Sequence, residues 1–220
     1  MRVVVFGAAG GVGSRILAVL ATTGHDLVGV VRRSDALDGV RATGAEAVLL
    51  DVVDGDLTAV LSGADAAIWC VGARFAADGP DGPARIDHDG AMRAVTAGVA
   101  AGVPRWVQVS SLMADRPEAG PPMLAPFLRA KGAVDEALRG TDLAWTVLRP
   151  AGLSDAPGTG TITAAEHLTP EAWGGGMPPQ VSRDDVAAIA IACAVDGLAI
   201  RRSCDLVGGS TPIAEALAAL

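Results

Sequence analysis

Short runs of apolar, mostly β-branched residues alternate along the chain with alanine-rich segments whose apolar positions recur every three or four residues. Runs of the first kind predict buried strands, and segments of the second kind predict helices that pack on them. The predicted strands are Arg2–Phe6, Asp26–Val31, Glu46–Leu50, Asp65–Val71, Arg105–Ser110 and Leu143–Leu148. The predicted helices are Ser14–Ala21, Asp56–Leu61, Arg85–Ala101 and Leu124–Arg139. This alternation predicts an α/β fold of Rossmann type, a doubly wound parallel sheet with helices on both faces.

The pattern changes after Pro150. Residues 152–163 are rich in glycine, and residues 169–179 contain three consecutive glycines and several prolines, which predicts loops and a short strand in a small substrate-side lobe. A helix over Asp184–Ala194 with Ser182 as its N-cap, a strand over Ser203–Val207 and a helix over Ile213–Leu220 are expected to follow. We therefore expect a single domain over residues 1–220. Residues 1–150 would form its cofactor-binding core, and residues 151–220 its lobe and C-terminal elements.

The composition is that of a folded chain. Half of the 220 residues are hydrophobic and 19% are charged, which leaves enough apolar surface for a sizeable core. The net charge is −8 at pH 7, whereas nucleic-acid-binding proteins normally carry a basic face. The longest strongly apolar stretch, Val186–Val195, is too short to span a bilayer. We therefore expect neither a nucleic-acid partner nor a membrane association.

Cysteine and histidine are few and scattered. Cys70, Cys193 and Cys204 form no CxxC pair, and the three histidines lie far apart in the sequence. Such spacing is typical of reduced core thiols in a cytoplasmic protein. The sequence thus predicts neither a disulfide framework nor a metal site.

The clearest local motif is the run Gly7-Ala8-Ala9-Gly10-Gly11-Val12-Gly13, directly after the first predicted strand. In this GxxGxxG spacing the first glycine permits a tight turn, and the second lets the backbone approach a pyrophosphate. The third lets the next helix pack closely on the strand. The N-terminus of that helix favours phosphate charge. The motif predicts a dinucleotide site, although a glycine-rich turn without a ligand has the same pattern.

The residues that follow the second and third predicted strands bear on which cofactor is bound. Arg32 and Arg33 stand where an acid would bind the ribose 2′-hydroxyl of NAD. Two guanidinium groups suit a 2′-phosphate, which favours NADP and leaves NAD as the alternative. The other interpretation is a solvated arginine pair bound to Asp35 or Asp38. Asp51 is placed to accept from the adenine amino group or to cap a turn.

These segments together resemble the atypical short-chain dehydrogenase/reductases, most closely their NAD(P)H-binding, NmrA-like branch. That branch includes small bacterial oxidoreductases and biliverdin or flavin reductase-like proteins. The resemblance covers nearly the whole chain. Beyond the glycine loop, it rests on Val30–Arg33, Leu50–Val52, Val109–Ser111, Ala130-Lys131, Asp135–Leu138, Trp145–Gly152, Gly160–Ile162 and Ser182–Ala187. The RPxxL pattern at 149–153 and the SRxDVA pattern at 182–187 are far more specific than the glycine loop.

The resemblance implies a set of cofactor contacts at the ends of the strands. They are Gly7, Ala9, Gly10, Gly11, Val12, Gly13, Arg32, Arg33, Asp51, Val52, Cys70, Val71, Gly72, Ser110, Lys131, Pro150, Ala151, Gly152 and Leu153. It also implies two catalytic residues: Ser111, or Ser110 beside it, would orient the substrate carbonyl, and Lys131 would hold the nicotinamide ribose. The plainer interpretations are a strand-end hydroxyl bonded to backbone and a lysine on a helix surface.

One position departs from the pattern of these enzymes. Their proton-transferring tyrosine stands four residues before the lysine, where this chain has Phe127, and the sequence contains no tyrosine at all. Phenylalanine cannot exchange a proton. Lys131 is nevertheless the only lysine among 17 basic residues, and its compact ammonium suits ribose hydroxyls. The departure disfavours tyrosine-dependent alcohol dehydrogenation.

Other side chains are weaker candidates. His88 has the pKa range of a proton donor, but Asp87 and Asp89 beside it are more simply interpreted as helix-capping acids. Arg149 is suited either to an acidic ligand or to a buried acid. Trp106 and Trp145, on predicted strands, are expected in the core.

The sequence therefore predicts an NAD(P)H-dependent oxidoreductase, a monomer or homodimer, that reduces a small organic acceptor such as a flavin, a quinone or a conjugated carbonyl. Such acceptors take hydride from the cofactor and a proton from water. Two alternatives stay open: an NAD(P)-binding redox sensor without turnover, and a sugar epimerase or dehydratase.

Overall fold

The computed structural model describes residues 1–220 apart from the side chain of Phe75. The strands are β1 (Arg2–Phe6), β2 (Asp26–Val31), β3 (Glu46–Leu49), β4 (Ala66–Trp69), β5 (Arg105–Val109), β6 (Ala144–Pro150), β7 (Leu153–Ser154), β8 (Thr161–Ala165), β9 (Val181–Ser182), β10 (Arg202–Gly208) and β11 (Thr211–Pro212). The α-helices are α1 (Gly13–Leu20), α2 (Leu37–Arg41), α3 (Leu57–Leu61), α4 (Phe75–Asp78), α5 (Ala91–Ala100), α6 (Ala125–Arg139), α7 (Arg183–Ile191) and α8 (Ile213–Ala218).

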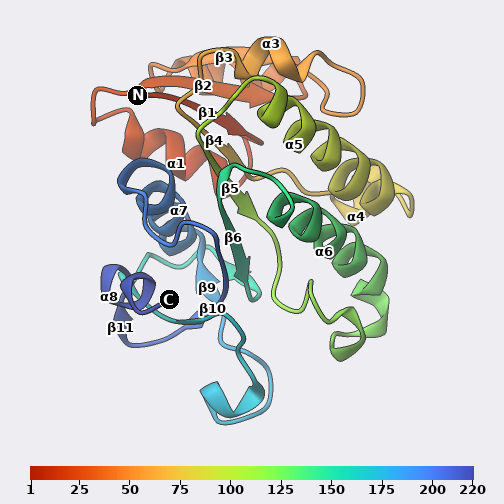
Figure 1. Ribbon diagram of the computed structural model, residues 1–220, viewed down its shortest axis with the longest axis vertical. Coiled ribbons are helices and arrows are strands. Elements are labelled where there is room, and N and C mark those ends of the chain that lie inside the picture. The colour runs from red at the N-terminus through yellow and green to blue at the C-terminus, as the bar shows by residue number, and fades with distance from the viewer.

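One large sheet forms the centre of the molecule (Figure 1). Its strand order is β11-β8-β10-β6-β5-β4-β1-β2-β3. The strands from β3 to β10 run parallel, and β8 and β11 join antiparallel at the far edge. A separate parallel pair links β7 to β9. The predicted Rossmann-type sheet is thus confirmed, with an antiparallel C-terminal edge.

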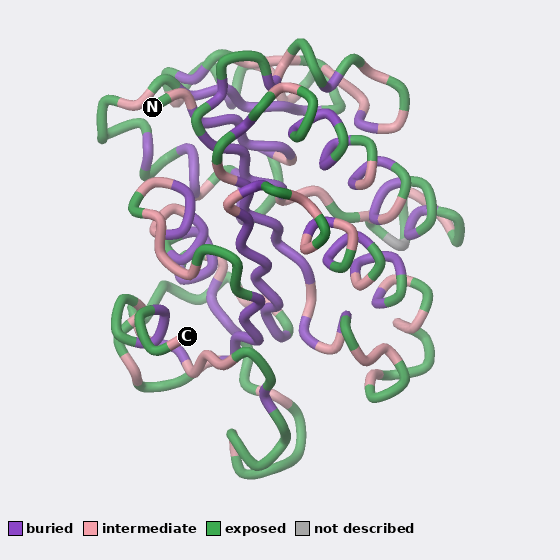
Figure 2. The backbone as a smooth tube through the Cα atoms, in the orientation of Figure 1, coloured by how far each residue is buried: buried purple, intermediate pink, exposed green. Residues whose placement is uncertain are grey.

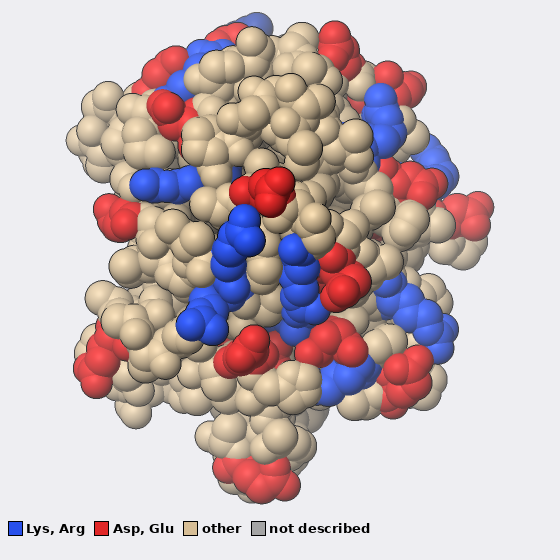
Figure 3. Space-filling view, in the orientation of Figure 1, with Lys and Arg blue, Asp and Glu red and all other residues tan. Residues whose placement is uncertain are grey.

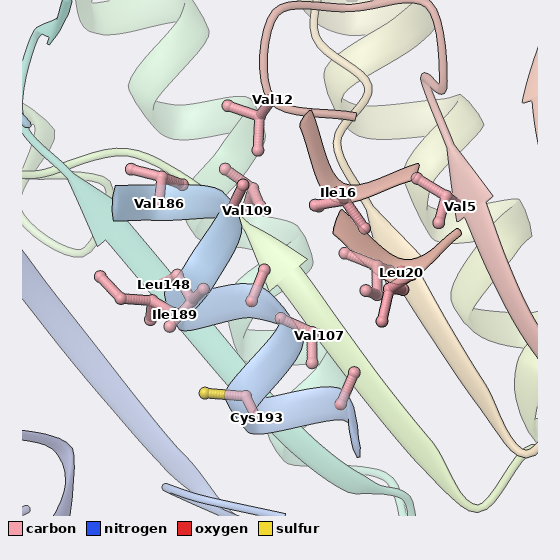
Figure 4. Close-up of a cluster of buried hydrophobic side chains, with 14 of the residues drawn as sticks. Val5, Val12, Ile16, Leu20, Val107, Val109, Leu148, Val186, Ile189 and Cys193 are labelled. Carbon is pink, nitrogen blue, oxygen red and sulfur yellow. The ribbon is translucent and has the colours of Figure 1, made fainter. Parts of the chain in front are cut away.

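The alternation of side chains along β1 explains why both faces of the sheet are covered. Val3 and Val5 pack in a cluster with α1 and α7, whereas Val4 and Phe6 pack in a second cluster with α3, α5 and α6. Figure 4 shows the first cluster between α1, α7 and the strands. Buried backbone follows the central strands and the inner sides of the helices (Figure 2). This is the arrangement expected of a parallel sheet with apolar side chains on both faces.

Aromatic side chains fill the second cluster. Phe6 lies 5.3 Å from Trp69 and 6.5 Å from Trp106 between ring centroids. Trp106 is fully buried and Trp145 is 7% exposed, so the prediction that both tryptophans belong to the core is confirmed.

Two predicted segments differ in the structure. The helix expected over Arg85–Ala101 consists of a π-helical segment, Pro83–Gly90, that continues into α5. The wider π turn changes which side chains face the sheet. The C-terminal segment also contributes more strand than expected, because β8 and β11 extend the main sheet. Ser182 caps α7 as predicted, since its hydroxyl accepts from the N–H of Asp184 at 3.2 Å. Among the described residues, no helix combines the length and apolarity needed to cross a bilayer.

Candidate cofactor and active site

The glycine loop has the shape that its motif predicts. Gly7 has a φ of +76°, in the left-handed region that glycine adopts without strain. A Cβ at Gly7 would lie 2.9 Å from the carbonyl oxygen of Cys70, and one at Gly13 would overlap the carbonyl oxygen of Gly7. The N–H of Gly10 donates to that same carbonyl at 2.8 Å. The loop therefore depends on glycine and leads directly from β1 into α1.

A cleft of about 210 Å³ opens at the carboxyl ends of β1, β2 and β4. The strand order reverses between β1 and β4, and open α/β sheets bind nucleotides at such a switch point. Ten of the predicted cofactor contacts line the cleft: Gly7, Ala9, Gly10, Arg32, Arg33, Asp51, Val52, Cys70, Val71 and Gly72. The lining is completed by Val30, Val31, Ala36, Leu50, Arg74, Asp78 and Ile86. The remaining predicted contacts lie outside this lining: Gly11, Val12, Gly13, Ser110, Lys131, Pro150, Ala151, Gly152 and Leu153.

Two ion pairs stand at the mouth of the cleft. Arg33 pairs with Asp35 at 2.9 Å, which is one of the surface pairs considered from the sequence. Arg32 instead pairs with Asp78 at 2.9 Å, a partner that the sequence did not indicate. Asp51 accepts a backbone N–H two residues further on, at 3.0 Å. Turn capping by Asp51 is thus observed, while its contact with adenine stays a prediction.

The three cysteines are free thiols in the structure. Burial raises the pKa of Cys70 and of Cys204 to about 12. It raises the pKa of Cys193 as well. All three are therefore protonated at neutral pH and poor nucleophiles, including Cys70 in the cleft lining.

A cluster of four charged side chains lies beside the glycine loop. Arg15 donates to the carbonyl oxygen of Gly11 at 2.6 Å and to Asp184 at 2.6 Å. The side chain of Arg183 occupies the space that a Cβ at Gly11 would fill. Asp155 pairs with Arg183 at 3.0 Å and with Arg15 at 3.2 Å. The cluster joins the glycine loop to the start of α7 and to the segment after β7.

Lys131 is buried between the ends of two strands, so the interpretation as a surface lysine is wrong. Its side chain is 4% exposed and lies 3.2 Å from the fully buried Asp87. Its Nζ donates to the carbonyl oxygens of Val71 at 3.0 Å and Val109 at 3.3 Å. The ammonium thus has one buried carboxylate as its ion-pair partner and two backbone carbonyl oxygens as hydrogen-bond acceptors. Lys131 therefore fixes the carboxyl ends of β4 and β5, and its contact with a ribose stays a prediction.

The position of Asp87 differs from that of the helix-capping acid expected from the sequence. It lies inside the π-helical segment and accepts the backbone N–H of Ala73 at 3.1 Å. The capping interpretation is therefore wrong for Asp87, because its carboxylate faces the buried ammonium and not a helix end. His88 beside it is 41% exposed and pairs with Asp89 at 2.7 Å.

A second buried charge network begins at Ser110. Its hydroxyl donates to Asp135 at 2.9 Å, and the Nε of Arg149 donates to the same carboxylate oxygen at 2.9 Å. Arg149 thus binds a buried acid, one of the two roles considered for it, and it also pairs at 2.9 Å with Asp115, whose side chain is 18% exposed. Burial raises the pKa of Asp135, and Arg149 opposes that rise.

The network extends toward the C-terminal strands. Arg116 pairs with Asp115 at 2.9 Å and with the fully buried Asp205 of β10 at 2.8 Å. His167 lies 3.1 Å from Asp115. The loop after β5 and the loop after β8 are therefore joined to the same charges.

The two serines after β5 occupy different environments. Ser110 is buried in the network just described, whereas Ser111 is partly exposed and makes a 3.4 Å hydrogen bond to the carbonyl oxygen of Leu112. Of the two, Ser111 has the weaker internal bond. A contact of either serine with a substrate stays a prediction.

Phe127 lies on α6 one helical turn before Lys131, and the Nζ of Lys131 is 5.7 Å from the centroid of its ring. The segment Pro150–Leu153, which is predicted to contact the cofactor, also hydrogen-bonds to neighbouring strands. Pro150 accepts from the N–H of Leu112 at 2.9 Å, Ala151 donates to β10, and Leu153 pairs with Val181 in the small sheet.

The surface around these elements carries both signs of charge. Lys and Arg side chains are interspersed with Asp and Glu over the face seen in Figure 3. Charged groups on this face are therefore mixed and do not form a broad basic surface.

The sheet, the glycine loop and the cleft define a nucleotide-binding α/β protein of Rossmann type. A family model for NAD(P)H-binding proteins matches residues 7–196. The chain is 36% identical over 220 residues to the uncharacterised sugar epimerase YhfK of Bacillus subtilis, with 99% of each chain covered. It superposes on a Bacillus halodurans protein named as a candidate NAD-dependent epimerase/dehydratase with a TM-score of 0.90 and 28% identity, over all of both chains.

More distant structures share the fold. The anaerobillin reductase ChuY of Escherichia coli O157:H7 has a TM-score of 0.75 and 22% identity, with 96% of this chain and 98% of that chain covered. The chain therefore belongs to the NAD(P)H-binding family of atypical short-chain dehydrogenase/reductases.

The sequence did not single out several charged residues of the site. Asp78 and Arg74 line the cleft, and Asp115, Arg116 and Asp205 belong to the buried network. Asp135 lay within a segment quoted for the resemblance, and its spacing of four from Lys131 places both on one face of a helix. The others carry no motif.

Proposed function

We propose that this protein is an NADPH-dependent oxidoreductase for a small organic acceptor that takes up hydride without a protein tyrosine, such as a flavin, a quinone or a conjugated carbonyl. The proposal rests on the phenylalanine at position 127. It stands one turn before the buried Lys131, where a tyrosine would transfer the proton, and the sequence contains no tyrosine.

A conjugated acceptor spreads the charge of the added hydride over its own atoms and takes its proton from water. The protein then has to position the reactants and exclude water from the hydride path.

The residues of the cleft fit a dinucleotide. Backbone N–H groups of the glycine loop and the start of α1 would hold the pyrophosphate. Arg32 and Arg33 at the cleft mouth would bind the 2′-phosphate, which favours NADPH over NADH. Asp51 would accept from the adenine amino group. When bound there, NADPH supplies the hydride.

The opposite end of the site would hold the nicotinamide and the acceptor. Gly72, which lines the cleft, lies next to the Lys131–Asp87 pair, since a Cβ at Gly72 would lie 3.8 Å from the Nζ of Lys131. Lys131 would exchange one internal acceptor for a ribose hydroxyl, and Ser111 would bind a carbonyl of the acceptor. Pro150–Leu153 would exclude water from the nicotinamide side.

The names of YhfK and the Bacillus halodurans protein favour a second candidate, a sugar epimerase or dehydratase. That chemistry begins with removal of a proton from a sugar hydroxyl, for which the Tyr–Lys pair is the usual base. Phe127 cannot take this role. The reductase is therefore the better supported proposal.

The test combines binding and turnover. NADPH and NADH are titrated into the purified protein, and oxidation of each is followed with a flavin, a quinone or no acceptor. A parallel sample holds a nucleotide sugar with NAD⁺. Tight NADPH binding with acceptor-dependent oxidation supports the reductase. Tight binding without turnover on any acceptor would indicate a sensor, and epimerised sugar without net oxidation would overturn the proposal.

A further inference from the structure

The mouth of the cleft is crossed by an ion pair between its two walls. Arg32 follows β2, and Asp78 ends α4 on the opposite side; their side chains meet at 2.9 Å. Both residues line the cleft. The guanidinium expected to bind a 2′-phosphate is therefore already bound to a carboxylate of the protein.

Asp78 is held firmly in this position. Its side chain is only 8% exposed. One carboxylate oxygen accepts the backbone N–H of Arg74 at 2.8 Å, and the other accepts from Arg32. The Arg74 N–H, and after it the Arg32 guanidinium, lower the pKa of Asp78. The carboxylate is thus ionised at neutral pH and anchored to α4.

The neighbouring pair at the cleft mouth has a different character. Arg33 and Asp35 are 56% and 69% exposed and lie two residues apart. Water solvates both groups, so Asp35 can release Arg33 to a ligand at little cost. Asp78 is more buried and keeps its second hydrogen bond to the backbone, so it remains close to any group that Arg32 binds.

We propose that Asp78 is a specificity-determining residue that competes with the cofactor 2′-phosphate for Arg32. The proposal rests on the part of the proposed function that places Arg32 at the adenosine 2′ position. A 2′-phosphate carries close to two negative charges and is repelled by a carboxylate that shares its arginine. A 2′-hydroxyl is neutral and can hydrogen-bond to either member of the pair. Asp78 therefore weakens NADPH binding and leaves NADH binding nearly unchanged.

The test is Asp78→Asn, which removes the charge and keeps an oxygen for the Arg74 N–H. Dissociation constants are measured for NADPH and NADH, and for 2′,5′-ADP and 5′-AMP, which differ only in the 2′-phosphate. We expect about tenfold tighter binding of NADPH and 2′,5′-ADP, with NADH and 5′-AMP within about twofold. Asp35→Asn is the matched control, and it should change all four constants by less than about twofold.

Two further variants keep the test decisive. Asp78→Ser supplies a second neutral side chain with a hydrogen-bond acceptor if the asparagine variant does not fold. In an Arg32→Ala background, Asp78→Asn should give no more than about a threefold gain for 2′,5′-ADP, because the contested guanidinium is absent. Equal shifts for ligands with and without the phosphate, or weaker binding of 2′,5′-ADP, would overturn the proposal.

None of these measurements needs an electron acceptor. The wild-type protein could bind both nucleotides, and Asp78→Asn could tighten NADPH binding while NADH binding stays nearly unchanged. The proposal then stands even when no acceptor is reduced. If the wild-type protein binds neither nucleotide, the proposed function and this inference both fall.

Discussion

The two ends of the site hold their charged groups in opposite ways. At the proposed adenosine end, Arg33 and Asp35 are more than half exposed and form an ion pair with each other. At the other end, Lys131 and Asp87 are 4% and 0% exposed, and each makes further hydrogen bonds to backbone. An exposed pair contributes little because water solvates both partners, whereas a buried charge that loses its partner is costly.

This difference separates ligand binding from folding. Arg33 can exchange its exposed protein partner for a phosphate with a small change in stability. Groups around Lys131 and Arg149 fix the ends of β4, β5 and β6, so their replacement acts on stability first. The contrast can be tested by substitutions that affect one end only.

Arg149→Met is expected to have the largest effect. Arg149 is 1% exposed and pairs with both Asp135 and Asp115. Methionine fills similar space but leaves the buried Asp135 without a cation, which should lower the free energy of unfolding by about 3–5 kcal/mol. Denaturant unfolding monitored by circular dichroism measures the loss.

The control is Arg33→Met, which removes an arginine from an exposed pair and should cost less than about 0.5 kcal/mol. A similar loss for both variants would mean that burial does not distinguish the two networks.

The loss in free energy of unfolding that Arg149→Met causes should also become smaller on acidification. Burial raises the pKa of Asp135 and Arg149 opposes that rise, so loss of Arg149 should raise this pKa further. The folded variant then takes up a proton at a higher pH than the unfolded chain or the folded wild-type protein, and it gains stability relative to the wild type as the pH falls through that pKa.

Asp87→Asn tests the same idea at Lys131. The ammonium would stay buried with two carbonyl oxygens but without its counter-charge, and the free energy of unfolding should fall by about 3 kcal/mol. Adding Lys131→Met removes the unpaired charge and should restore at least about half of that loss. Additive losses in the double variant would show that the two side chains do not act as a pair.

The sequence predicted those parts of the molecule that depend on local pattern. The strands from β1 to β6, the glycine loop and the two arginines after β2 each follow from residues adjacent in the chain. Phe127 was identified by its spacing from Lys131. The parallel arrangement of the sheet followed from the alternation of strand and helix, because parallel neighbours need crossovers.

The remainder depends on contacts between distant segments. Asp78 meets Arg32 across 46 positions, from a four-residue helix whose sequence has no motif. Asp87 faces inward because a π-helical segment changes the register, and no residue pattern marked that segment. Arg116 reaches Asp205 across 89 positions. Such pairs become visible only when the fold brings their elements together.

Arg32→Ala tests the adenosine end. Loss of the guanidinium should weaken NADPH binding by about tenfold, because a charge-assisted contact with the 2′-phosphate is lost. NADH affinity should stay within about twofold, and the melting temperature should hardly change. Fluorescence titration with both nucleotides measures the affinities.

Arg41→Ala is the matched control, since Arg41 is also an exposed arginine paired with an aspartate, Asp38, and does not line the cleft. It should leave both affinities unchanged. Equal weakening of NADPH and NADH by Arg32→Ala would exclude a specific role at the 2′-phosphate.

Phe127→Tyr should have the smallest effect, and it probes the boundary between the two ends. Phe127 lies beside Lys131 and outside the described lining of the adenosine cleft. One added hydroxyl there should leave NADPH affinity within about twofold, because the proposed cofactor contacts lie mostly at the adenosine end. Phe127→Leu, which removes the ring but adds no polar group, is the control in the same titration.

If Phe127→Tyr weakens NADPH binding strongly while Phe127→Leu does not, the new hydroxyl contacts the bound cofactor. The Lys131 end would then contribute to affinity as well as to stability, contrary to the division drawn between the two ends.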